Sequence, residues 1–170
     1  MTIKIFITGG TIDDLNYGYE DKKQNSTKSL IPALLKQARL SEKYDAEVLF
    51  MKDSRLVTDE ERKIIFENCK NCKENKIIIT HGTMTMPITA KFLGKSSIKK
   101  TISSIKKTIV LTGSALPAKS KKSDAMFNLG FAFAAVQILK NGVYVAMNGK
   151  IFLWNDVRKN LKTGYFEKEK

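Results

Sequence analysis

The chain has 170 residues, 42% of them hydrophobic, with a formal net charge of +13 and a sequence pI of about 9.7. This length fits a hydrophobic core and excludes a second domain of comparable size, so we expect residues 1–170 to form a single domain. No apolar run approaches the roughly 20 residues that span a bilayer, and no charged start leads into an apolar leader. We therefore expect no membrane association and a cytoplasmic protein.

Lysine supplies almost all of the positive charge, since the only arginines are Arg39, Arg55, Arg62 and Arg158. A basic balance of this size is compatible with nucleic acid, anionic lipid or acidic partners. Base and phosphate recognition favours the guanidinium fork over the lysine ammonium. We therefore interpret the charge as a solvated lysine-rich surface and do not expect nucleic acid as a partner.

The stretch Thr2–Asp13 begins as a β-branched and aromatic run typical of a buried strand, and Gly9 and Gly10 end it sharply. Thr11 follows directly. Without side chains, the two glycines let the backbone turn tightly and aim N–H groups at a phosphate or a developing oxyanion, and a hydroxyl placed there can act as a nucleophile. An ordinary Gly-Gly turn is the alternative interpretation.

The polar stretch Asp13–Thr27 predicts a long loop beside Thr11, either a binding loop or plain surface. Beyond it, strands and helices alternate. We expect helices from about Leu30 to Ala38, from a capping box at Thr58, after Pro87, and over Ser123–Lys140. We expect further strands at Glu47–Met51, Ile77–Thr80, Thr108–Thr112 and Val143–Met147.

This alternation, with strands nearly continuous in apolar residues, predicts an α/β fold: a three-layer, doubly wound, mostly parallel sheet of the flavodoxin or Rossmann kind. The carboxyl ends of parallel strands share one edge, where ligands bind. Thr11, Ser54, Thr83 and Ser114 follow the strand ends. We therefore expect a hydroxyl-rich site at that edge.

A threonine nucleophile needs a base and an oxyanion cradle. His81, the only histidine, is one candidate base, although its place at a strand end also suits a buried structural role. A lysine with a pKa lowered by burial is another. Cys69 and Cys72 have a CxxC spacing but no second pair, so we expect neither a metal site nor a redox site.

Two motifs resemble the signatures of the bacterial-type L-asparaginase family: TGGTID at Thr8–Asp13 and THGTMTM at Thr80–Met86. Four further stretches are similar to the same family, at residues 52–54, 111–117, 123–129 and 148–160. The resemblance covers nearly the whole chain. It identifies a short, single-domain member that resembles the family's N-terminal domain and lacks its C-terminal domain.

The resemblance implies cofactor-free hydrolysis of L-asparagine to L-aspartate and ammonia in a homo-oligomer, a dimer or tetramer. Thr11 matches the nucleophile, Thr83 the second catalytic threonine and Lys159 the lysine that works with it. Tyr17 is our choice for the catalytic loop tyrosine, with Tyr19 as the fallback. The substrate-binding positions implied by the resemblance are Gly10, Ser54, Gly82 and Met84.

Met84 departs from the family pattern, which has an aspartate there to bind the substrate's amino group. A thioether offers no charge-assisted hydrogen bond to an ammonium. The family's second domain also lends an acidic residue to a neighbouring site. Three interpretations stay open: an amidohydrolase that acts on asparagine or on a different amide, a weak or silent binding protein with the same fold, and, as the alternative to a solvated lysine surface, nucleic-acid binding. The nearby acids that offer a replacement charge are Asp13, Asp14, Asp53 and Asp156.

Overall fold

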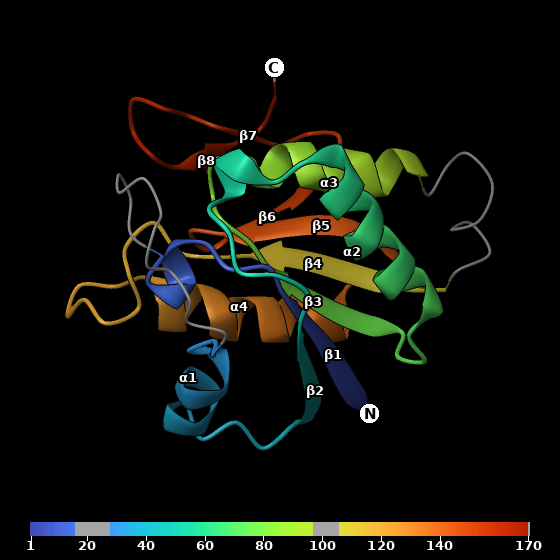
Figure 1. The fold of residues 1–170 in the computed structure, drawn as a ribbon, viewed down its shortest axis with the longest axis horizontal. Helices are drawn as coiled ribbons and strands as arrows, with labels where there is room; N and C mark the ends of the chain where they lie inside the picture. The colour runs from blue at the N-terminus through green and yellow to red at the C-terminus, as the bar shows by residue number, and fades with distance from the viewer. Residues whose placement is uncertain (16–27, 97–105, 170) are drawn as a thin grey trace.

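A computed structural model describes residues 1–15, 28–96 and 106–169 (Figure 1). A six-stranded sheet has the order β2-β1-β3-β4-β5-β6, parallel except for β6, and β7 and β8 form a separate antiparallel pair. The strands are β1 (Thr2–Ile7), β2 (Lys43–Val48), β3 (Lys76–Thr80), β4 (Thr108–Thr112), β5 (Gly142–Met147), β6 (Lys150–Leu153), β7 (Arg158–Lys159) and β8 (Phe166–Glu167). The helices are α1 (Ile31–Gln37), α2 (Asp59–Asn71), α3 (Met86–Ser96) and α4 (Ala125–Ile138), with 3-10 turns η1 (Thr11–Asp13) and η2 (Ser54–Leu56).

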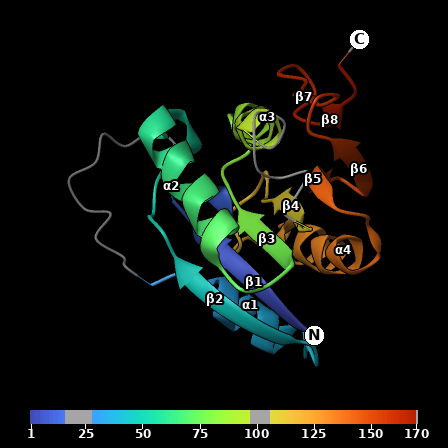
Figure 2. The same ribbon diagram turned by 90° about the vertical axis from the view of Figure 1, so that its right-hand side faces the viewer.

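The helices cover both faces of the sheet, α1 and α4 on one and α2 and α3 on the other (Figure 2). Alternation along β1 divides the core accordingly, because successive side chains point to opposite faces. Ile5 packs with α1 and α4, and Phe6 packs with α2 and α3. The predicted doubly wound, mostly parallel α/β sheet is confirmed.

The prediction of the second strand was wrong in its position. The strand is β2 at Lys43–Val48, whereas we expected Glu47–Met51. β2 is an edge strand with largely exposed side chains, so it lacks the apolar run of a buried strand. The apolar residues Leu49–Met51 instead follow the strand end and pack, partly buried, against the two halves of the core.

The predicted loop Asp13–Thr27 is only partly described. Its first residue ends the 3-10 turn η1, and residues 16–27 lie outside the described residues. The short strands β6, β7 and β8 were not predicted. Among the described residues, no helix is long and apolar enough to cross a membrane.

Asn128 ties α4 to the edge of the sheet that carries the strand ends. Its side-chain amide donates to the Gly113 carbonyl at 3.0 Å and to an Asp124 carboxylate oxygen at 2.8 Å. Its side-chain oxygen accepts from the Asn148 backbone N–H at 3.1 Å. The side chain is fully buried, so these bonds satisfy groups that water cannot reach.

We predict that Asn128→Ala destabilises the protein by about 1–3 kcal/mol, because it leaves the buried Gly113 carbonyl and the partly buried Asn148 N–H without this partner. Urea unfolding should show a lower midpoint with an unchanged m value. The exposed Asn71→Ala in α2 is the matched control, with an expected change within about 0.5 kcal/mol. Equal midpoints for both variants would contradict the anchoring role.

Candidate active site

The ends of β1 and β3 bring two turns together. The strands run parallel with Ile7 opposite Thr80, and the Thr8 N–H and hydroxyl donate to the Thr80 carbonyl at 3.1 and 2.8 Å. The segments that follow, Gly9–Thr11 and His81–Thr83, therefore leave the sheet side by side. This confirms that residues after different strands meet at one edge.

Glycine is required where the turns touch. Gly10 has a φ of 88°, and a Cβ on it would lie 2.5 Å from the Gly82 Cα. A Cβ on Gly82 would in turn lie 2.7 Å from both Cβ and Oγ of Ser54. Any side chain at either glycine would push the three turns apart.

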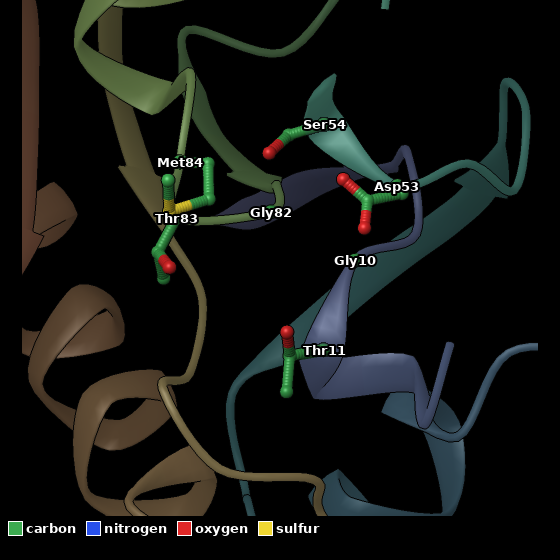
Figure 3. Close-up of a pocket in the computed structure, with 7 residues that line it drawn as sticks. All are labelled: Gly10, Thr11, Asp53, Ser54, Gly82, Thr83 and Met84. Atoms are coloured by element: carbon green, nitrogen blue, oxygen red, sulfur yellow. The ribbon is translucent and has the colours of Figure 1, made fainter. Parts of the chain in front are cut away.

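One pocket lies at this contact (Figure 3). It is lined by Gly10, Thr11, Asp53, Ser54, Gly82, Thr83 and Met84. Figure 3 shows Thr11 on one side of the gap, with Thr83 and Met84 on another. The Thr11 and Thr83 side chains, 72 positions apart in the sequence, thus line the same small space.

Lys159 on β7 reaches this pocket from the far end of the sequence. Its Nζ donates to Thr83 Oγ1 at 2.7 Å and lies 3.5 Å from Met84 Sδ. Burial lowers the pKa of Lys159 below the usual lysine value, and the negative charge of Asp124 opposes part of that shift. The amine is therefore easier to deprotonate than a surface lysine.

Asp53 is the one acidic side chain among the seven described lining residues, and it forms an ion pair with Arg55. Asp53 Oδ1 accepts from the Arg55 backbone N–H at 2.9 Å and from Nε at 3.1 Å, and Oδ2 accepts from a terminal guanidinium nitrogen at 2.7 Å. The hydrogen bonds from the Arg55 side chain hold the pKa of the Asp53 carboxyl below its usual value. Next to it, the Thr85 hydroxyl donates to the Ser54 carbonyl at 2.6 Å. This hydrogen bond joins the segment after β3 to the turn that contains Ser54.

His81 is fully buried and hydrogen-bonded inside the core. Arg62 Nε donates to Thr89 Oγ1 at 3.2 Å, Thr89 Oγ1 lies 2.9 Å from His81 Nε2, and His81 Nδ1 lies 2.8 Å from the Gly82 carbonyl oxygen. Because a carbonyl oxygen only accepts, Nδ1–H donates to Gly82; in the neutral ring Nε2 is then the acceptor, and the Thr89 hydroxyl donates to it. Burial lowers the pKa of His81 to about 4, which keeps it neutral at pH 7. This row of hydrogen bonds holds the Gly82 carbonyl toward the core. Because the carbonyl and the N–H of a trans peptide point in opposite directions, the Thr83 N–H points away from the core.

The predicted site residues fall into three groups. Those that line the pocket are Gly10, Thr11, Ser54, Gly82, Thr83 and Met84. Lys159 contacts two of them. Tyr17 and Tyr19 lie outside the described residues, so their place beside Thr11 stays a prediction.

Other candidates from the sequence have different surroundings. The Ser114 hydroxyl donates to a carbonyl of its own loop at 2.6 Å and does not line the pocket. Of the four acids considered as replacement charges, only Asp53 lines it. Asp13 is buried and accepts hydrogen bonds from the start of α1, while Asp14 and Asp156 form ion pairs with lysines.

Sequence reasoning missed Asp124, which precedes α4. Its carboxylate accepts from the Ala115 and Leu116 backbone N–H groups, each at 3.0 Å, and its charge acts on Lys159. The Ser-Asp pair ahead of an apolar helix was the available signal, since these residues are typical of helix starts. Nothing in the sequence indicated that this start faces the lysine.

Cys69 and Cys72 are free thiols at the end of α2, and burial raises the pKa of Cys69 above its usual value. Within residues 1–15, 28–96 and 106–169, no group of three or more His, Cys, Asp or Glu side chains is placed to hold a metal ion. Among the described residues, the pocket is lined by the hydroxyl-bearing residues Thr11, Ser54 and Thr83 and by the Asp53 carboxylate, and the Lys159 amine adjoins it.

A doubly wound sheet with hydroxyls gathered where its strands end defines an α/β protein with an edge site suited to small ligands. The family model described as "Asparaginase, N-terminal" matches residues 2–166. The chain therefore belongs to the asparaginase family and corresponds to its N-terminal domain.

Individual relatives agree with this assignment. The protein named "Probable L-asparaginase periplasmic" from Haemophilus influenzae is 32% identical over 173 residues, covering 95% of this chain and 47% of its own length. A "Glutaminase-asparaginase" from Acinetobacter glutaminasificans is 36% identical over 115 residues, covering 64% of this chain and 33% of its own. The chain thus spans about half or less of the length of these relatives.

Solved structures give the same result. The thermostable L-asparaginase from Thermococcus kodakarensis is similar with a TM-score of 0.76 and 27% identity, over 99% of this chain and 51% of that one. A probable cytoplasmic L-asparaginase from Campylobacter jejuni has a TM-score of 0.70 and 32% identity, over 93% and 48%. L-asparaginase I from Vibrio cholerae, at 22% identity and a TM-score of 0.80, supports the fold.

We predict that Thr89→Val, which removes the hydroxyl between Arg62 and His81, lowers the free energy of unfolding by about 1–3 kcal/mol. The shape of the side chain is nearly kept, so the loss reports the two hydrogen bonds. Chemical denaturation measures it, with the exposed Thr163→Val as the control. A change in Thr89→Val no larger than in the control would show that the buried chain of hydrogen bonds contributes nothing.

Proposed function

We propose that the protein is an asparaginase-type amidohydrolase that converts a small carboxamide, such as the side-chain amide of L-asparagine, to the acid and ammonia. Thr11 is the nucleophile in this proposal. The observation that carries it is the meeting of the Thr11 and Thr83 side chains in one pocket, with the Lys159 amine 2.7 Å from the Thr83 hydroxyl. Membership of the asparaginase family supports the reaction class.

In the proposed reaction, Thr11 Oγ1 attacks the amide carbon and its proton passes toward the Thr83–Lys159 pair. Backbone N–H groups of the glycine turns stabilise the oxyanion; the Thr83 N–H, directed away from the core, is one candidate donor. The carbon–nitrogen bond breaks, and the nitrogen leaves as ammonia after taking up a proton. Water then hydrolyses the ester on Thr11 and restores its hydroxyl.

Thr11→Ala is expected to lower kcat for ammonia release by at least about 1,000-fold, because the nucleophilic oxygen is gone. Thr11→Ser should retain part of the activity, and the exposed Thr163→Ala should retain all of it. Circular dichroism checks that each variant is folded. Activity in folded Thr11→Ala comparable with the wild type would refute the assignment of the nucleophile.

Lys159 predicts the pH dependence. The pKa of Lys159 is lowered from the ordinary lysine value of about 10.4. The neutral amine, which can accept a proton, is therefore present at lower pH than in an ordinary lysine. We expect kcat/KM to rise with pH and to level off below that ordinary value. Lys159→Met should show no such rise with pH, and its kcat/KM should be about 100- to 10,000-fold lower than that of the wild type.

The exposed Lys162→Met, on the same hairpin, is the control for Lys159→Met. It should keep both the rate and the pH profile of the wild type. A rise with pH that persists unchanged in Lys159→Met would assign the titration to another group.

One observation favours a second candidate, a protein that binds a small amide without turnover. Met84 Sδ lies 3.5 Å from Lys159 Nζ, where an acidic side chain would hold the lysine more firmly by charge. Absence of ammonia release, together with measurable binding of an amide by calorimetry, would favour this candidate.

The oligomeric state and the location of the protein belong to the proposal as well. We propose a homo-oligomer and a cytoplasmic location. The relatives include a protein named as periplasmic and one named as cytoplasmic, so both locations occur among them. Sedimentation of the purified protein measures the oligomer directly.

A further inference from the structure

The charges around the pocket limit the ligand that it can hold. Of the seven lining residues, only Asp53 is ionisable, and Arg55 binds both of its carboxylate oxygens. A ligand cation at this point would have to compete with a guanidinium that already makes two side-chain hydrogen bonds. Among the described lining residues, no carboxylate is therefore left unpaired for a ligand cation.

Among the described residues, the opposite side of the pocket adds no lining carboxylate. Met84 is a thioether, and its Sδ lies 3.5 Å from the Lys159 amine. Protonated, Lys159 repels a cation; neutral, it supplies no anion. Asp124 acts on Lys159, but its oxygens already accept from Ala115, Leu116 and Asn128.

An ammonium bound here would lose water without gaining a charge-assisted partner, which is costly. A carboxylate meets the reverse situation. The Ser54 hydroxyl is a donor that the proposed reaction at the amide leaves free, and glycines at positions 10 and 82 let a ligand approach the backbone closely. The net charge of +13 also attracts anions.

We propose that the preferred substrate is an amide of a dicarboxylic acid that carries a free carboxylate and no α-ammonium, with succinamate as the probe. This inference rests on the proposed function. Succinamate and L-asparagine share the same carbon chain, amide and carboxylate, and differ only by the ammonium. At neutral pH succinamate has a net charge of −1, whereas asparagine is neutral overall.

The test compares kcat/KM for ammonia release from the two amides with purified full-length protein. We expect succinamate to exceed L-asparagine by at least about tenfold, the scale set by a binding group left without its partner. Met84→Asp places in the pocket a carboxylate that can pair with the ammonium of asparagine. It should lower the succinamate-to-asparagine ratio of kcat/KM by at least about tenfold. Calorimetric titration of Thr11→Ala with each amide gives the same comparison for binding, without turnover.

Ile88→Asp is the matched control for the added charge. Ile88 is 53% exposed on α3, only four positions from Met84 but not a lining residue. This variant carries the same extra negative charge as Met84→Asp and should leave the succinamate-to-asparagine ratio as in the wild type. A similar shift in both variants would assign the effect to overall charge and overturn the role of Met84.

The remaining outcomes separate this inference from the proposed function. If the wild type hydrolyses asparagine as well as or better than succinamate, the inferred substrate class is wrong and the hydrolase stands. If neither amide is hydrolysed, the proposed function fails, and binding to Thr11→Ala decides the inference alone: equal or tighter binding of asparagine overturns it. A ratio unchanged by Met84→Asp in a folded protein shows that Met84 does not select the substrate.

Discussion

The contact of Gly10 with Gly82, and of Gly82 with Ser54, is the constraint on which the rest of the site depends. A side chain at either glycine would meet neighbouring atoms at 2.5–2.7 Å, so three turns from separate strands can close on one another only without it. Parallel pairing of β1 with β2 and β3 delivers these turns to one edge. The presence of Thr11 and Thr83 in one pocket is then a consequence of backbone packing, and it does not require direct contact between the two side chains.

Buried polar side chains stabilise the same edge from the core side through hydrogen bonds to the backbone of the turns. His81 is neutral and holds the Gly82 carbonyl, and Asn128 holds the turn after β4. These side chains face the core, whereas Thr83 faces the pocket. The end of β3 thus carries neighbouring residues with different surroundings, one bonded inside the core and one lining the pocket. Arg55 pairs with Asp53, so the other polar groups of the described residues at the pocket are hydroxyls and the Lys159 amine.

The sequence predicted the parts of the fold in which burial dominates. β4 was predicted with its observed bounds at Thr108–Thr112, because a central strand buried on both faces is continuously apolar. β2 was misplaced because an edge strand lacks that signal. At the site, the glycine turns and both threonines could be found from sequence. The pairing of Asp53 with Arg55 and the electrostatic link from Asp124 to Lys159 could not, since they depend on side-chain directions and on contacts between distant segments.

The most direct test of the central claim, that Thr11 is the nucleophile of an amidohydrolase, is to find the acylated residue. The protein is mixed with succinamate or L-asparagine, quenched with acid within the first turnover, digested and mapped by mass spectrometry. We expect an added acyl mass on the peptide that contains Thr11 and none on the corresponding peptide of Thr11→Ala. An acyl group on the peptide that contains Thr83, or on any other residue, would contradict it.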